Sequence, residues 1–167
     1  MLLAGNGKVS GDIRLGPMGE VARPLAGDID VRFPDLALIA GFVPALQEPK
    51  GELTLQARLG GTTQQPAMDG SIMINDAAAV LPDAGISLSD TRLVLRGDGT
   101  GPLQIEGSAR SGEGQVSIEG SVDLFSGDAP RVDLAIRGEN FEVVNLPEAR
   151  VLVSPDLRLQ GAQDYRL

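Results

Sequence analysis

The residues that could carry chemistry in this chain are few and scattered. Asp28 and Asp30 stand two positions apart, so a strand would place both carboxylates on one face, and Asp98 stands in a glycine-rich stretch. The 167 residues include no His and no Cys, which removes thiol nucleophiles, Ser-His-Asp arrangements and zinc sites of the Cys/His type. We therefore interpret the three aspartates as solvated carboxylates and predict that the protein is not an enzyme.

The glycine-rich stretch, residues 97–101, resembles a phosphate-binding loop only superficially. It lacks the Lys-Ser/Thr ending and the following helix that such a loop requires. The sequence also contains no EF-hand pattern. We predict a hairpin turn at 97–101, and we predict no cofactor and no metal.

Composition indicates a globular protein with an aliphatic interior. Hydrophobic residues make up 42% of the chain and charged residues 22%, which together predict a single folded domain over residues 1–167. Aromatic residues make up only 3%, so Leu, Ile, Val and Ala must form any apolar interior. A cysteine-free chain is compatible with the periplasm.

The net charge of −9 limits the classes of partner. Nucleic-acid binding needs clustered Lys and Arg, whereas the 14 basic residues here are spread singly. A negative surface is also a poor match for anionic lipid headgroups, so any lipid contact should use apolar surface. No run approaches the roughly 18 apolar residues of a membrane span, and residues 1–4 are too short for a signal peptide.

Alternation with a period of two dominates the chain and predicts β-strands. Residues 25–33 illustrate it, since Ile29 and Val31 share one face while Asp28 and Asp30 share the other. The predicted strands are 8–15, 25–33, 51–59, 68–74, 77–81, 86–88, 93–95, 103–109, 116–124 and 132–137, with more within 140–161. About eleven short strands joined by hairpin-like turns make an antiparallel all-β protein.

Several breaks in the alternation mark special positions. Asn75-Asp76 predicts a turn between two strands, and a change of phase near Asp90 predicts a bulge or a break. Asp35 can cap one short helix near residues 35–42, with Gly41 or Pro44 ending it. We interpret this apolar helix as a plug over the end of the core, and a gate over a groove is the alternative.

Glycine recurs on the apolar face of the predicted strands. The unit apolar-x-Gly-x-apolar occurs at residues 9–13, 25–29, 68–72, 105–109 and 118–122. Glycine at such positions indicates strong coiling of the sheet, or space left open along its inner face, and the two interpretations are compatible. The spacing of the units is irregular, which excludes a strict solenoid.

The dry face of this sheet needs a cover. About twenty Leu, Ile and Val residues point to it, and burying each one fully is worth roughly 1.5–3 kcal/mol. The sheet must therefore fold on itself, dimerise or hold apolar ligands. Within 140–161, we expect Phe141, Val143, Val151 and Val153 to continue the aliphatic face, with a bend at 145–147.

Residues 138–157, with the sequence GENFEVVNLPEARVLVSPDL, resemble the C-terminal region of the TamB family. Residues 59–66 and 81–88 are similar to other recurring segments of that region, and the likeness extends over about residues 25–161. The resemblance implies a fragment of a longer periplasmic protein that is anchored in the inner membrane of a Gram-negative bacterium. It also implies a fold like that of AsmA-like and bridge-type lipid-transfer proteins, in which a curled antiparallel sheet forms a taco-like, U-shaped trough with an aliphatic interior.

The same resemblance implies a function without catalytic residues. The family works with TamA, an outer-membrane barrel protein, as the translocation and assembly module in outer-membrane biogenesis and protein secretion, and it is linked to phospholipid transport. The expected role of this chain is therefore to shield or conduct phospholipid acyl chains in a hydrophobic groove. The predicted wall is Ile29, Val31, Leu53, Leu55, Ile72, Ile74, Leu95, Leu103, Ile105, Val116, Ile118, Val122, Val132, Leu134, Ile136, Phe141 and Val143.

Two other interpretations of these residues remain open. The same alternation is typical of an ordinary dry sandwich core, and only the resemblance favours a trough. The chain could also be a chaperone-like module whose strand edges pair with unfolded outer-membrane β-segments.

Overall fold

The computed structural model describes residues 7–19, 21–39, 47–123 and 131–162, which form eleven β-strands and one turn of 3-10 helix. The strands are β1 (Lys8–Leu15), β2 (Leu25–Phe33), β3 (Gln47–Gly61), β4 (Pro66–Leu81), β5 (Ile86–Gly99), β6 (Leu103–Ser111), β7 (Gly114–Asp123), β8 (Arg131–Glu139), β9 (Phe141–Leu146), β10 (Ala149–Val153) and β11 (Asp156–Ala162). The predicted all-β class is confirmed. A hairpin connection follows β5 as predicted, but β5 extends to Gly99, so the connection to β6 comprises residues 100–102 and not 97–101.

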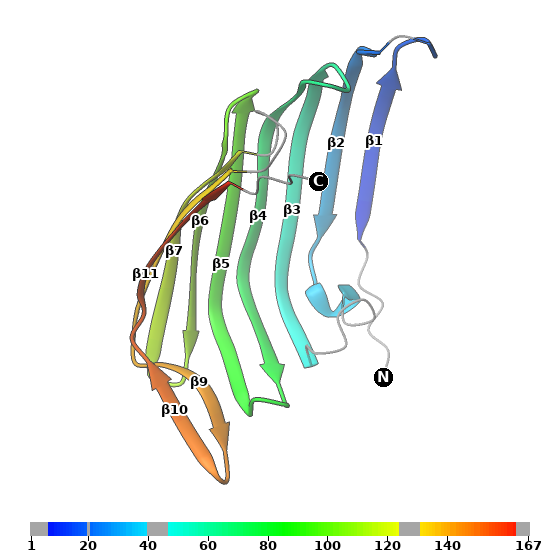
Figure 1. Ribbon diagram of the computed structural model, residues 1–167. Coiled ribbons are helices and arrows are strands. Elements are labelled where there is room, and N and C mark those ends of the chain that lie inside the picture. Colours follow the sequence, from blue (N-terminus) through cyan, green and yellow to red (C-terminus); the bar gives the residue numbers. More distant parts are fainter. Residues whose placement is uncertain (1–6, 20, 40–46, 124–130, 163–167) are drawn as a thin grey trace.

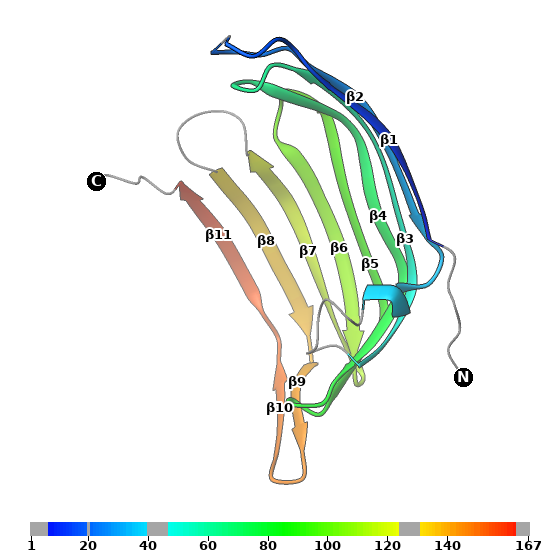
Figure 2. The ribbon, with the colours of Figure 1, turned by 90° about the vertical axis from the view of Figure 1, so that its right-hand side faces the viewer.

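Nine strands form one open antiparallel sheet in the order β1-β2-β3-β4-β5-β6-β7-β8-β11. Figures 1 and 2 show this sheet bending both along and across its strands, so that it encloses a trough. The sheet does not close, and β1 and β11 are its two edges. The curled, U-shaped sheet that the family resemblance implied is therefore the observed fold.

Glycine allows neighbouring strands to approach closely where the sheet curls. Gly70 and Gly120 have φ angles of 149° and 152°, a region that L side chains rarely adopt. A Cβ atom at Gly70 would collide with the carbonyl oxygen of Gln56, and one at Gly120 with the carbonyl oxygen of Asp133. The coiling interpretation of the recurring glycines accounts for both positions.

A line of bulges crosses the lower part of the sheet in Figure 1. The register shifts in β3 between residues 47 and 52, in β4 between Ile74 and Ala77, and in β5 between Ser89 and Arg92. The bulge predicted near Asp90, whose φ is 47°, is confirmed. The turn predicted at Asn75-Asp76 is wrong, because β4 continues through a bulge there and runs for 16 residues.

The bulges preserve the apolar face. Leu95 pairs with Ile105, and Leu88, on the far side of the bulge in β5, pairs with Ser111. Ile105 and Ser111 are an even number of positions apart on β6, which has no bulge, so both side chains face the same side of the sheet. The extra residue in β5 therefore returns Leu88 to the face of Leu95, which explains the change of phase in the sequence.

Residues 140–161 do not simply extend the sheet. Strands β9 and β10 pair with each other as a separate two-stranded hairpin, and only β11 returns to pair with β8. Asn140, with a φ of 48°, lies where the chain leaves β8. Strand β11 thus continues the main sheet, whereas Phe141, Val143, Val151 and Val153, which were expected to continue its aliphatic face, all lie on the β9–β10 hairpin and do not pair with it.

The predicted short helix is a single turn of 3-10 helix, η1 (Leu36–Ile39). Asp35 Oδ1 accepts a hydrogen bond from the Ala37 backbone N–H at 2.8 Å, as expected of a cap. Leu36 is only 4% exposed, and η1 packs against β3, in agreement with a plug. Residues 40–42 of the predicted helix and its expected ends at Gly41 or Pro44 lie outside the described residues.

Substitution of Gly120 by alanine tests the role of glycine in the coiled sheet. We expect Gly120→Ala to lower the free energy of unfolding by about 1–3 kcal/mol, because the new Cβ atom meets backbone at an unfavourable φ. Gly60→Ala is the matched control, since no atom lies within 4 Å of its Cβ position, and it should be neutral or stabilising by up to about 1 kcal/mol. Urea unfolding followed by circular dichroism measures both. Equal effects of the two changes would contradict this account.

Candidate functional site

Two aliphatic rows cross the inner face of the sheet, and each runs from strand to strand through directly paired residues. The first row spans all nine strands and consists of Val9, Val31, Leu55, Ile72, Leu95, Ile105, Gly120, Leu134 and Leu159. The second row spans eight strands and consists of Phe33, Leu53, Ile74, Leu93, Gly107, Ile118, Ile136 and Leu157. Register therefore produces an apolar surface that is continuous across the sheet.

Most side chains of these rows are half-buried. The buried aliphatic side chains of the described residues are Leu36, Ala77, Ile86, Val94 and Leu103. At the two edges the first row becomes more open, with Val9 67% exposed and Leu159 51% exposed. The inner face is thus an aliphatic surface over much of its length and lacks the fully buried centre of a sandwich core.

The structure brings most of the predicted wall residues together. Ten of them lie in the two rows: Val31, Leu55, Ile72, Leu95, Ile105, Leu134, Leu53, Ile74, Ile118 and Ile136. Leu103, Val122 and Val132 pair in a shorter third row, Ile29 pairs with Gly11 and Ala57, and Val116 pairs with Ala109 and Gly138. Phe141 and Val143 lie apart from these rows, on the separate hairpin, where they are half-buried.

Besides Gly107 and Gly120, the predicted wall lacked five apolar side chains of the rows: Val9, Phe33, Leu93, Leu157 and Leu159. Each stands an even number of positions from another apolar residue of its strand, so it shares a face with that residue. The period of two could therefore have identified all five. Gly107 leaves a hollow of about 190 Å³ between Leu93 and Ile118. The inner face is therefore apolar and also uneven, with a hollow at Gly107.

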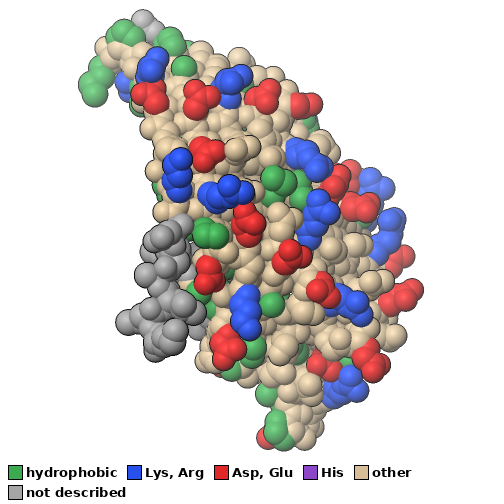
Figure 3. Space-filling model, turned by 180° about the vertical axis from the view of Figure 1, so that it is seen from behind, with side chains coloured by type: hydrophobic (Ala, Val, Ile, Leu, Met, Phe, Trp, Pro, Cys, Tyr) green, Lys and Arg blue, Asp and Glu red, His purple; other side chains and the backbone are tan. Residues whose placement is uncertain are grey.

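The outer face carries the charges. Figure 3 views the sheet from behind and shows basic and acidic side chains distributed over it. Arg58 Nε lies 3.3 Å from Asp28 Oδ1, and Gln56 Nε2 donates a hydrogen bond to Asp30 Oδ2 at 3.0 Å. Asp98 is exposed near the end of β5 rather than in the turn itself. Across the described ranges, no His, Cys, Asp or Glu residues form a group of three or more that could hold a metal ion.

A buried carboxylate fixes the β9–β10 hairpin in place. Glu142 is 4% exposed, and it accepts hydrogen bonds from Arg150 Nε at 2.7 Å and Asn145 Nδ2 at 3.0 Å. The Asn145 backbone N–H also donates to the carbonyl of Ala84 at 2.8 Å, which ties the hairpin to the β4–β5 turn. Period-two reasoning missed this cluster because its members belong to a hairpin that leaves the sheet.

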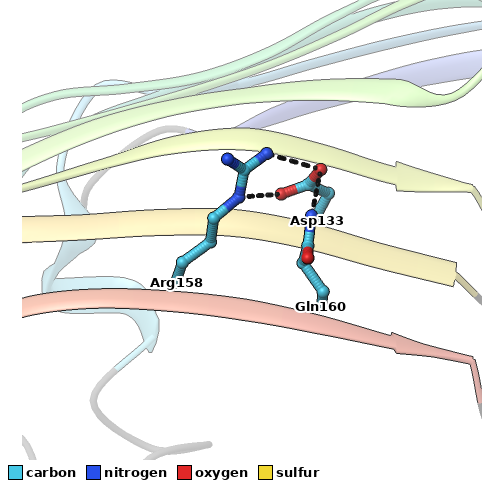
Figure 4. Close-up of polar contacts among 3 residues, drawn as sticks. All are labelled: Asp133, Arg158 and Gln160. Atoms are coloured by element: carbon cyan, nitrogen blue, oxygen red, sulfur yellow. Dashed lines mark hydrogen bonds and ion pairs between the residues drawn. The ribbon is translucent and has the colours of Figure 1, made fainter.

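A second polar cluster fastens the edge strand β11 to β8, as Figure 4 shows. Arg158 donates two hydrogen bonds to the Asp133 carboxylate, at 3.2 and 3.1 Å, and Gln160 Nε2 donates a third at 3.2 Å. These hydrogen bonds, chiefly those from Arg158, hold the pKa of Asp133 below its ordinary value of 3.8. The same pairing raises the pKa of Arg158.

Two models of known protein families match the sequence of this chain. The model of the TamB N-terminal domain matches residues 1–74, and the model of the TamB C-terminal domain matches residues 104–166. The chain belongs to the TamB family. Both TamB matches include strands of the nine-stranded sheet. The first covers β1 to β3 and most of β4, and the second covers β6, β7, β8 and β11 together with the separate β9–β10 hairpin.

A curated relative agrees with this assignment. The translocation and assembly module subunit TamB of Haemophilus influenzae is 21% identical over 156 residues, which make up 93% of this chain and 12% of that protein. The chain thus corresponds to about one eighth of that relative's length. No solved structure gives a significant match. Among the described residues, no helix is long and apolar enough to cross a membrane.

The Asp133 cluster predicts a pH dependence. Because the pKa of Asp133 is lower in the folded state than its ordinary value, its stabilising contribution is complete above about pH 3.8 and is lost as pH falls through the folded-state value. We expect an NMR titration to place the Asp133 pKa below 3.8, and Arg158→Gln to raise it towards 3.8. An unchanged Asp133 pKa in that variant would contradict the assigned cause.

Proposed function

We propose that the trough shields or conducts the acyl chains of phospholipids, as a non-enzymatic part of the translocation and assembly module in outer-membrane biogenesis. The carrying observation is the pair of aliphatic rows, continuous across nine and eight strands of an open sheet. A half-exposed aliphatic surface of this extent is unfavourable in water, and acyl chains would cover it without requiring specific polar contacts.

Dimensions support this proposal. Eight inter-strand distances of about 4.8 Å give the first row a contour length of roughly 38 Å. The acyl layer of one bilayer leaflet is about 15 Å thick, half of a hydrocarbon core of about 30 Å. An acyl chain lying along the row would therefore be in contact with aliphatic side chains over its whole length.

The proposed wall consists of the seventeen predicted residues together with the five row members that prediction missed. Phe141 and Val143 would extend it at the lower end, where β9 contacts β5, β6 and β7. By the family relationship, we further propose that the whole protein is periplasmic, is anchored in the inner membrane and acts with TamA. Residues 1–167 would then be one β domain of that longer protein.

A second function is favoured by the open edges of the sheet. Within the described part of the chain, β1 pairs only with β2 and β11 pairs only with β8, so each edge strand presents backbone groups that no described strand pairs. Such edges could receive unfolded outer-membrane β-segments by strand addition. This chaperone-like role places the client at the sheet edge, whereas the lipid role places its ligand on the inner face.

A charge on the inner face tests the lipid role. Ile118 is half-buried in the second row, and Glu119, its neighbour on β7, is exposed on the outer face. We expect Ile118→Arg to abolish most binding of a fluorescent phospholipid, because an arginine would be desolvated against acyl chains, while Glu119→Arg preserves it. Circular dichroism should show both variants folded. If Ile118→Arg unfolds the chain, the row is a packed core and the trough proposal is wrong.

Photo-crosslinking separates the two candidate functions. A photoreactive residue at Ile105, in the middle of the first row, should give phospholipid adducts when the full-length protein is irradiated in cells. The same residue at Ser10, on edge strand β1, serves as the comparison. Polypeptide adducts at both positions with no lipid at Ile105 would favour the chaperone-like role.

A further inference from the structure

The outer face carries a hollow that the trough does not explain. It has a volume of about 650 Å³ and lies over β5 to β8 and β11. Its floor is formed by Ser108 and Ser117, which are directly paired on β6 and β7. Two short side chains surrounded by longer ones make the depression, on the side of the sheet opposite the aliphatic rows.

The charged groups around this floor are only partly paired. Arg137 Nε lies 3.7 Å from Asp156 Oδ1 and so has a partner. Arg110 forms no ion pair with the described residues, and neither do Asp90 and Glu139, which line the same hollow. Elsewhere on the outer face, arginines such as Arg58 have carboxylate partners. The hollow therefore presents one available guanidinium, that of Arg110, and two available carboxylates, Asp90 on the β5 side and Glu139 on the β8 side.

Register holds Arg110 and Glu139 apart. Arg110 pairs with Gln115, and Gln115 pairs with Glu139, so the two charges stand two strands, about 10 Å of backbone, from each other. Ser117 lies diagonal to Arg110 on the next strand, within reach of a ligand that the guanidinium holds. The donors thus gather around β6 and β7, and Glu139 stands on the β8 side.

We propose that this hollow binds a small zwitterion that carries a phosphate and an ammonium group. Arg110 and the Ser108 hydroxyl suit a phosphate, which offers several acceptor oxygens to a forked guanidinium, and the Ser117 hydroxyl beside them donates to the Arg137 carbonyl at 3.4 Å. Glu139 suits the ammonium group. A simple anion would be repelled by Asp90 and Glu139 and a simple cation by Arg110, so the lining favours a ligand with both charges.

Titration of the chain with phosphoethanolamine tests this site. We expect saturable binding by calorimetry that is tighter than binding of inorganic phosphate or of ethanolamine alone. Arg110→Gln and Glu139→Gln should each weaken it by about tenfold or more, since each removes a charge-assisted contact. Arg58→Gln, which alters an exposed arginine elsewhere on this face, should leave it unchanged. Circular dichroism checks the fold of every variant.

Absence of saturable binding, equal weakening by Arg58→Gln, or full binding by Glu139→Gln would overturn the proposal. Sedimentation with phosphatidylethanolamine vesicles identifies the source of the ligand. Sedimentation that depends on Arg110 indicates a lipid headgroup, whereas binding of the soluble compound alone indicates a free zwitterion, and either result supports the site. Because phosphoethanolamine has no acyl chain, failure here leaves the function of the trough untouched.

Discussion

Backbone pairing across nine antiparallel strands places every second side chain on the same side of the sheet, and the rest of the structure depends on that constraint. Once the register is set, Val9 on the first strand and Leu159 on the last belong to one aliphatic row. A shift of a single residue in any strand would interrupt the row and turn its aliphatic side chains outwards. The register therefore decides both where the apolar surface lies and how far it continues.

Curvature and register are coupled through bulges and glycines. A bulge would normally turn the side chains of every later residue in its strand to the opposite face. In β4 and β5 the apolar residues move from even to odd positions, or the reverse, at the bulge itself. The inner face therefore stays apolar on both sides of the bulge. Gly70 and Gly120 let adjacent backbones approach where a Cβ atom would prevent it. The sheet can thus bend sharply while its inner face stays apolar.

The main sheet is open, and polar contacts hold both its edge strand β11 and the β9–β10 hairpin in place. At β11, hydrogen bonds from Arg158 and Gln160 to Asp133 secure the last strand on the outer face, where they do not disturb the inner one. At the lower end, the buried Glu142 holds the β9–β10 hairpin against neighbouring turns. Both TamB domain matches include strands of this one sheet, so the backbone hydrogen bonding runs on without a break from one matched region to the other.

The sequence by itself determined the strands, their two faces, the aliphatic interior and the bulge at Asp90, because alternation with a period of two is a local property that each strand carries separately. It also held the family resemblance in residues 138–157. Only the tertiary structure decided that Asn75-Asp76 is a bulge within β4, that Phe141 and Val143 leave the main sheet, and that Glu142 is buried beside Arg150. These features depend on which strand lies beside which, and pairing between segments far apart in the chain leaves no periodic signal in either one.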